Sequence, residues 1–140
     1  MSYHFSTHLT TSWEQAQERV RAALQSAGFG IVSEIDVAQT LRKKLGIEFR
    51  PYLILGACQP HYAHQAILAE AHIGTMLPCN VLLQQQEDGR VEVSAIDPMA
   101  SMQAVANPAL ADVAQAVQQQ LRQVIEALSQ QGPGAPLNAR

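Results

Sequence analysis

The chain has 140 residues, of which 47% are hydrophobic and only 15% are charged, and its formal net charge is −3 with a pI near 5.9. This length suits one domain with a hydrophobic core. The composition excludes an intrinsically disordered chain. The slightly negative net charge gives no sign of the basic surface that binding to nucleic acid requires. No apolar run approaches the ~18 residues of a membrane span, and the first residues lack the build of a secretory signal. We therefore expect a soluble cytoplasmic protein with neither a nucleic-acid nor a membrane partner.

The first two elements are a strand and a helix. Residues 3–9 alternate loosely between polar and apolar side chains, as in a strand. The residues from Thr11 to Glu14 have the spacing of a capping box with Thr11 as the N-terminal cap. Apolar residues then recur at helical spacing until Gly28, where we expect this helix to end.

Four further elements are predicted before residue 73. Branched residues favour a strand over 29–37, and a short helix over 39–45 follows it. Residues 51–58 are continuously apolar, as in a strand buried on both faces. Pro60 suits the first turn of a helix that runs to about His72. Its inner face is expected to carry Ala63, Ala66, Ile67 and Ala71.

The last elements are a hairpin and a long helix. Strands are predicted over 79–86 and 90–96, because an Asp-Gly pair between two strand patterns is typical of a tight turn. A helix is predicted from Ala109 to about Ser129, because apolar residues recur there at steps of three and four. These residues are Leu110, Ala114, Val117, Leu121, Val124 and Leu128.

The order of these elements predicts the class of fold and its assembly. Residues 1–130 are expected to form a single α+β domain, in which a mostly antiparallel sheet of about five strands has helices packed on one side. The Gly- and Pro-rich residues 131–140 are expected to form a mobile tail. The charge content is well below the average of roughly 25%. Together with the apolar residues near 81–83 and 95–96, it predicts a homodimer.

The predicted hairpin gathers polar and reactive residues at one end of the sheet. A two-residue loop at 88–89 would place Asn80 opposite Asp97 and Cys79 opposite Pro98. A three-residue loop would shift this pairing by one place and keep the cluster. The far end of the hairpin is therefore the first candidate for a site.

A second thiol could join this cluster. Cys58 ends its predicted strand just before the helix at Pro60, and a helix N-terminus favours the nucleophilic thiolate. If the strands that end at Cys58 and begin at Cys79 are antiparallel, the two thiols lie at the same end of the sheet; if parallel, they lie ~20 Å apart. Both cysteines could instead be small buried core residues.

Methionines and histidines of the same region are further candidate metal ligands. The cysteine segments are flanked by Met76, Met99 and Met102. Thioether and thiolate ligands together favour a soft cation such as Cu(I). Methionines in loops, however, more often fill gaps in the packing. Three histidines of the helix after Pro60 lack the spacing of a zinc site, so we expect them at the surface. They are His61, His64 and His72.

Three segments of the chain resemble the uncharacterised-domain family numbered 302. These are Ile-Leu-Gly-Ala-Cys-Gln-Pro at 54–60, Ile-Gly-Thr-Met-Leu-Pro-Cys-Asn-Val at 73–81 and Val-Ser-Ala-Ile-Asp-Pro at 93–98. The resemblance covers roughly residues 3–128. It implies a compact α+β domain with a tendency to dimerise, and it implies no particular activity. The family's motif positions correspond here to Cys58, Pro60, Gly74, Pro78, Cys79, Asn80, Asp97 and Pro98.

Two classes of function follow from these observations. The first is a dimeric binding or redox module, in which Cys58 and Cys79 share a pocket for a soft metal or a small ligand and Asn80 and Asp97 donate or accept hydrogen bonds at its wall. The second is a dimeric interaction protein, in which the motif residues only support the fold and Gly74 takes a positive φ. No acid–base pair can be assigned, so the sequence leaves catalysis and any cofactor undecided.

Overall fold

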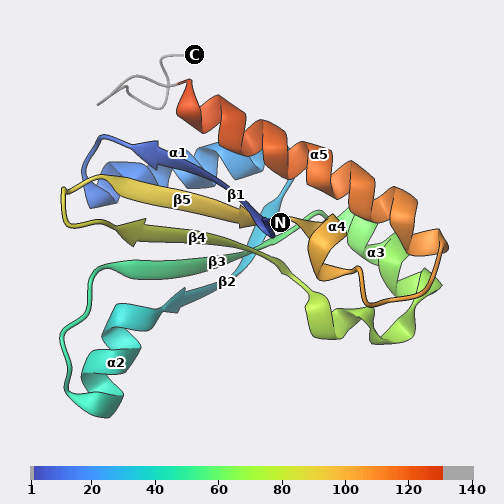
Figure 1. The fold of residues 1–140 in the computed structure, drawn as a ribbon, viewed down its shortest axis with the longest axis horizontal. Coiled ribbons are helices and arrows are strands. Elements are labelled where there is room, and N and C mark those ends of the chain that lie inside the picture. Colours follow the sequence, from blue (N-terminus) through green and yellow to red (C-terminus); the bar gives the residue numbers. More distant parts are fainter. Residues whose placement is uncertain (1, 131–140) are drawn as a thin grey trace.

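The structure is a computed structural model that describes residues 2–130 (Figure 1). Residues 131–140, which we predicted to form a mobile tail, lie outside the described residues. The strands are β1 (His4–Leu9), β2 (Gly30–Asp36), β3 (Tyr52–Cys58), β4 (Cys79–Gln85) and β5 (Val91–Ile96). The helices are α1 (Trp13–Ser26), α2 (Val37–Leu45), α3 (Pro60–Ala69), the 3₁₀ helix η1 (Ala71–Met76), α4 (Pro98–Ser101) and α5 (Ala109–Ser129).

The five strands form one sheet in the order β1-β5-β4-β3-β2, and every neighbouring pair is antiparallel. The helices α1 and α5 pack over the same face of this sheet (Figure 1). The predicted α+β class, with a mostly antiparallel sheet of about five strands and helices on one side, is confirmed.

The core lies between the sheet and the helices α1 and α5. Successive side chains of a strand point to opposite faces, and the inward residues of the central strands are fully or nearly fully buried there. They are Leu53, Leu55 and Ala57 of β3, Val81 and Leu83 of β4, and Val91, Val93 and Ala95 of β5. Three residues that we had counted toward a dimer surface, Val81, Leu83 and Ala95, are therefore core residues, and the homodimer stays a prediction.

Helix α5 follows the predicted apolar stripe. All six predicted residues are buried, and Ile125 joins them because it continues the same stripe by one residue. The side-chain oxygen of Asn107 accepts a hydrogen bond of 3.0 Å from the backbone N–H of Ala109, which satisfies a free donor at the helix start. The expected packing of this helix against the sheet is confirmed.

Two local predictions were wrong by one residue. Helix α1 is capped by Ser12, whose hydroxyl accepts from the backbone N–H of Gln15 at 3.1 Å, whereas Thr11 donates to the Gln15 side chain. The hairpin has a three-residue loop at 87–89, because the backbone N–H of Gln86 bonds the carbonyl of Arg90. Val81 consequently pairs with Ala95, and the three-residue alternative is correct.

The predicted helix 60–72 is divided in the structure. Helix α3 ends at Ala69, where Glu70 takes an extended conformation, and η1 then begins. Of its predicted inner residues, Ala66 is buried and Ala63 is half-buried, but Ile67 and Ala71 are exposed. Ile67 is still within α3, so only Ala71 lies beyond the break. The short helix α4 was not predicted.

The part of the chain that the structure describes contains no helix long and apolar enough to cross a membrane.

Candidate functional site

A cavity of about 300 Å³ lies where the ends of β3 and β4 meet the helices α3, η1, α4 and α5. Its walls are almost wholly apolar side chains, and its polar groups are confined to two thiols, one amide and one phenol. The two thiols belong to Cys58 and Cys79, the amide to Gln59 and the phenol to Tyr62. An apolar cavity with a few polar groups is the usual form of a small-molecule site.

The antiparallel pairing of β3 with β4 brings the two thiols together. Ala57 lies directly opposite Cys79, so Cys58 and Cys79 stand at the same end of the sheet, as the antiparallel alternative predicted. Both line the cavity, Cys79 as a buried residue and Cys58 as a half-buried one. Gln59 follows as the N-terminal cap of α3, and its side-chain oxygen accepts from the backbone N–H of His61 at 3.3 Å.

The two thiols differ in their protonation chemistry. Burial is the main cause that raises the pKa of Cys79 to about 11, and a negative charge on Cys58 contributes in the same direction. At neutral pH, Cys79 is therefore a thiol, which acts as a weak hydrogen-bond donor and a polarizable contact.

Gly56 allows one wall of the cavity to approach the sheet. A Cβ atom added at Gly56 would overlap the hydroxyl of Ser33 and would lie 2.6 Å from Cγ of Pro78. Pro78, which follows a cis peptide bond, lines the cavity next to Cys79. The absence of a side chain at Gly56 thus makes room for Pro78 at the cavity end of β3.

The two other predicted site residues have different surroundings. Asn80 is exposed, is paired with Gly56 and is not among the residues that line the cavity. The carboxylate of Asp97 caps α4, where it accepts hydrogen bonds of 3.0 Å from the backbone N–H of Met99 and from Nε2 of Gln118. Asp97 thereby joins α4 to α5 beside the cavity.

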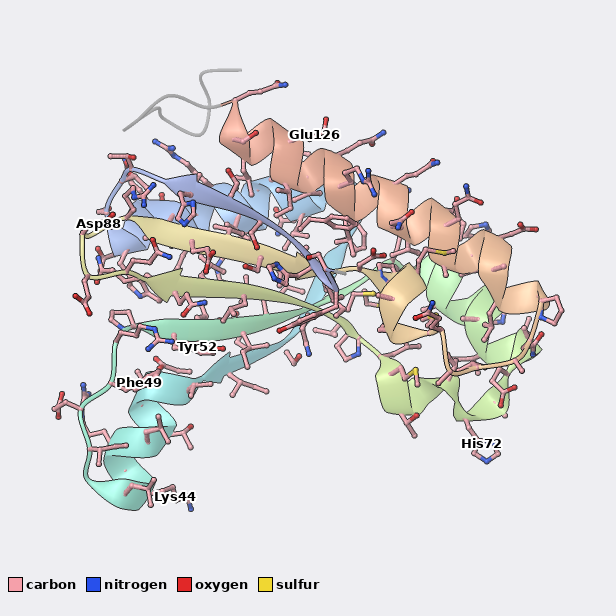
Figure 2. The ribbon with its side chains drawn as sticks, viewed as in Figure 1. Lys44, Phe49, Tyr52, His72, Asp88 and Glu126 are labelled. Carbon is pink, nitrogen blue, oxygen red and sulfur yellow. The ribbon has the colours of Figure 1, made fainter. Side chains whose placement is uncertain are left out.

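The predicted metal ligands do not gather as one set. Met102 lines the cavity, but Met76 and Met99 are exposed and lie outside its lining. His72 points away from the body of the molecule, where Nδ1 lies 3.7 Å from a carboxylate oxygen of Glu70 (Figure 2). Within residues 2–130, no group of three or more His, Cys, Asp or Glu side chains could hold a metal ion.

The sequence reasoning missed the residues that shape the cavity. Small side chains from four elements leave the space open, and two aromatic rings bound it. The small residues are Ala57, Ala63, Ala66, Gly74 and Ala114, and the rings are those of Phe29 and Tyr62. The one feature of the sequence that pointed to this wall of the cavity was the spacing of Ala63 and Ala66, which places both on the same face of a helix. Gly74 was expected to have a positive φ, but the glycines with a positive φ in the described chain are Gly28, Gly46 and Gly89.

Comparison with known proteins places the chain in a family. A solved structure described as the crystal structure of uncharacterized conserved protein DUF302 from Bacillus stearothermophilus superposes with a TM-score of 0.83 at 24% sequence identity. The alignment covers 90% of this chain and 98% of that chain, so the two share a fold. No curated protein matches the chain. The family model described as Domain of unknown function DUF302 matches residues 5–128, and the chain therefore belongs to this family, as its three motif segments indicated.

Proposed function

We propose that this domain binds a small, uncharged and largely apolar molecule in the cavity at the end of β3 and β4. The observation that carries the proposal is the cavity itself, which has about 300 Å³ of space between apolar walls with both cysteine thiols at its surface. A charged ligand would lose its hydration there without gaining a charged partner, because the lining holds no Lys, Arg, His, Asp or Glu side chain.

The volume sets the size of the ligand. An apolar cavity of ~150 Å³ in a protein core accepts one benzene molecule. The cavity described here has about 300 Å³, so it has room for a compound of about two fused or linked aromatic rings, or for an aliphatic molecule of similar volume. The rings of Phe29 and Tyr62 supply faces and edges against which such a ligand can pack.

The two thiols provide the polar end of the site. Cys79 stays protonated at neutral pH, so its S–H can donate weakly to a carbonyl or ether oxygen of the ligand. Cys58 is half-buried and is therefore open to solvent as well as to the cavity. A ligand with one polar atom would be oriented by this end, while its apolar part contacts the alanines of α3 and α5.

Binding of 6-propionyl-2-(dimethylamino)naphthalene, an uncharged two-ring probe whose fluorescence rises in apolar surroundings, tests the proposal. The wild-type chain should bind this probe, and Ala63→Leu should weaken its affinity by about tenfold or more, because the added carbons fill part of the cavity. Ala127→Leu is the matched control, since Ala127 is exposed on α5 and far from the lining. The proposal fails if the wild-type chain does not bind the probe, or if Ala63→Leu binds it as well as Ala127→Leu does.

A soft cation is the second candidate ligand, and the sulfur atoms of the cavity favour it. Cys58, Cys79 and Met102 all line the same space, and thiolate with thioether ligands is the set that Cu(I) prefers. Binding would have to release the proton of Cys79, whose raised pKa opposes this step. One equivalent of Cu(I) should then protect both thiols from alkylation, and Cys79→Ser should remove most of the affinity. Unprotected thiols in the presence of Cu(I) would eliminate this candidate.

A further inference from the structure

The segment from β2 through α2 to residue 50 is unusually exposed. Every residue from 30 to 50 except Ala38 is exposed or only half-buried. A helix of nine residues is marginal in water by itself and depends on packing, yet Ala38 is the one buried side chain of α2. The fold of a single chain therefore leaves this helix with little to stabilise it.

Large apolar side chains concentrate on the same segment. Within residues 2–130, ten large hydrophobic residues are exposed, and five of them fall between residues 32 and 49. These five are Val32, Ile35, Leu45, Ile47 and Phe49. Half of the exposed large apolar residues thus lie in about a sixth of the chain, which is typical of a surface that another molecule covers.

Strand β2 also leaves backbone groups available. In the described chain β2 pairs with β3 only, so its other side is an edge of the sheet. A bulge between Ile31 and Ser33 interrupts the ladder, and residues 33–36 form the regular part of this edge. A free strand edge is a template for pairing with a further strand.

Helix α2 does not pack tightly on its own sheet. A hollow of about 290 Å³ separates it from the start of α1, between Trp13, Ala38 and Phe49. The helix projects from the β2 edge, with Lys44 at its far end and Phe49 on the loop that returns to β3 (Figure 2). It lies at the opposite end of the sheet from α3 and η1 (Figure 1).

We infer that residues 30–50 form the surface through which two copies of this chain pair, with their β2 edges antiparallel across a two-fold axis. A stable interface uses about 20–30 residues of each partner, and this segment has 21 residues, all of them except Ala38 exposed or half-buried. A two-fold interface brings the same surface to itself. The segment carries charges of both signs. Arg42, Lys43 and Lys44 lie on α2, and Glu34 and Glu48 lie beside it. Two copies of this surface therefore do not meet with charges of one sign alone.

This arrangement has a consequence for the cavity. In an antiparallel pair, the residues that follow β2 in the second copy lie beside the start of β2 in the first. Helix α2 of the second copy would therefore reach the end of the sheet where Val32 and Cys58 line the cavity. The dimer surface and the proposed ligand site would then adjoin, although neither proposal depends on the other.

Sedimentation velocity on the full chain at about 50 µM tests the inference. The wild-type chain should sediment as a species of twice the 15.2 kDa mass of one chain. The double variant Ile35→Lys, Ile47→Lys should be monomeric, with a dissociation constant raised by about a hundredfold or more. Both residues are about half exposed, at 50% and 44%, so a single folded chain can accommodate lysine there, and circular dichroism should confirm an unchanged fold.

Tyr3→Lys is the matched control. Tyr3 is 65% exposed and stands beside β1, at the other edge of the sheet, so this variant should remain dimeric. Three outcomes would overturn the inference: a wild-type chain that sediments as a monomer, a double variant that stays dimeric, or a control that dissociates as the double variant does.

Discussion

Ala57 of β3 lies directly opposite Cys79 of β4, and this single pairing brings Cys58, the next residue of β3, to the same end of the sheet as Cys79. Both cysteines line one apolar cavity, but their surroundings differ. Cys79 is buried and its pKa is raised to about 11, whereas Cys58 is half-buried at the end of its strand. The pair therefore combines one accessible thiol with one shielded thiol.

The two thiols should react with Ellman's reagent in two phases at pH 8. With a pKa of about 11, only about one Cys79 in a thousand is thiolate at this pH, so Cys79 should react at least about tenfold more slowly than Cys58. Stopped-flow absorbance measures both phases. Cys58→Ser should remove the fast phase and Cys79→Ser the slow one. Equal rates, or a fast phase that persists in Cys58→Ser, would contradict the difference in burial.

Leu121→Ala should lower the free energy of unfolding by about 2–5 kcal/mol, as is usual for a large buried residue cut back to alanine. Leu121 is fully buried in the middle of α5, where it packs against the sheet. Urea unfolding followed by circular dichroism measures the loss. Gln119→Ala, at an exposed position of the same helix, is the control and should change stability by less than about 0.5 kcal/mol. A loss of similar size in both variants would show that Leu121 does not pack as described.

The ion pair between Arg21 and Glu34 should make a small contribution to stability that depends on pH. Two hydrogen bonds of 2.8 Å join the guanidinium to the carboxylate, and the Arg21 hydrogen bond is the main cause of the lowered pKa of Glu34. Because the folded-state pKa is the lower one, the contribution is present above the ordinary glutamate pKa of about 4.3 and is lost as pH falls through the folded-state value.

Glu34→Gln should therefore destabilise the chain at pH 7 by about 0.2–1 kcal/mol, the range for exposed pairs. The difference between variant and wild type should vanish near pH 2, where the carboxylate is protonated. Urea unfolding at both pH values measures this difference, and Glu87→Gln, at an exposed position of the β4–β5 loop, controls for loss of charge alone. A difference that persists unchanged at the lower pH would exclude the ion pair as its cause.

Gly28→Ala should cost about 1–2 kcal/mol of stability, because Gly28 has φ +91°, a conformation that a side chain strains. The added Cβ would also lie 3.1 Å from Nε2 of Gln59, the cap residue of α3. Gly74→Ala is the matched control, since Gly74 has no positive φ and an added Cβ meets nothing within 4 Å. Thermal unfolding of the two variants compares them, and an equal effect would be inconsistent with the backbone strain at Gly28.

The elements whose signals are local could be predicted from the sequence. The stripe from Leu110 to Leu128 marked the buried face of α5, because helical periodicity depends only on neighbouring turns. The Asp88-Gly89 pair marked the β4–β5 hairpin for the same reason, and only the loop length was wrong at first. The resemblance to the DUF302 family also depended on short segments of sequence, and the family match confirms it.

The candidate site was only partly predictable. Cys79 and Asp97 could be placed near each other because a hairpin joins them, but the direction of β3 relative to β4 is decided by how the chain crosses through α3 and η1. The sequence left both directions open for Cys58. The surroundings of Asn80 and Asp97 could not be predicted from the sequence either. Asn80 is exposed to solvent, and Asp97 caps α4, a helix of only four residues.

By itself the sequence determined the class of fold, most strand and helix positions and the family, all of which depend on patterns a few residues apart. Only the tertiary structure decided that small residues of β3, α3, η1 and α5 enclose a cavity, and that α2 stands exposed beside a free strand edge. Both features arise from the packing of segments far apart in the chain. A cavity or an uncovered surface is space left between such segments, and no run of neighbouring residues encodes it.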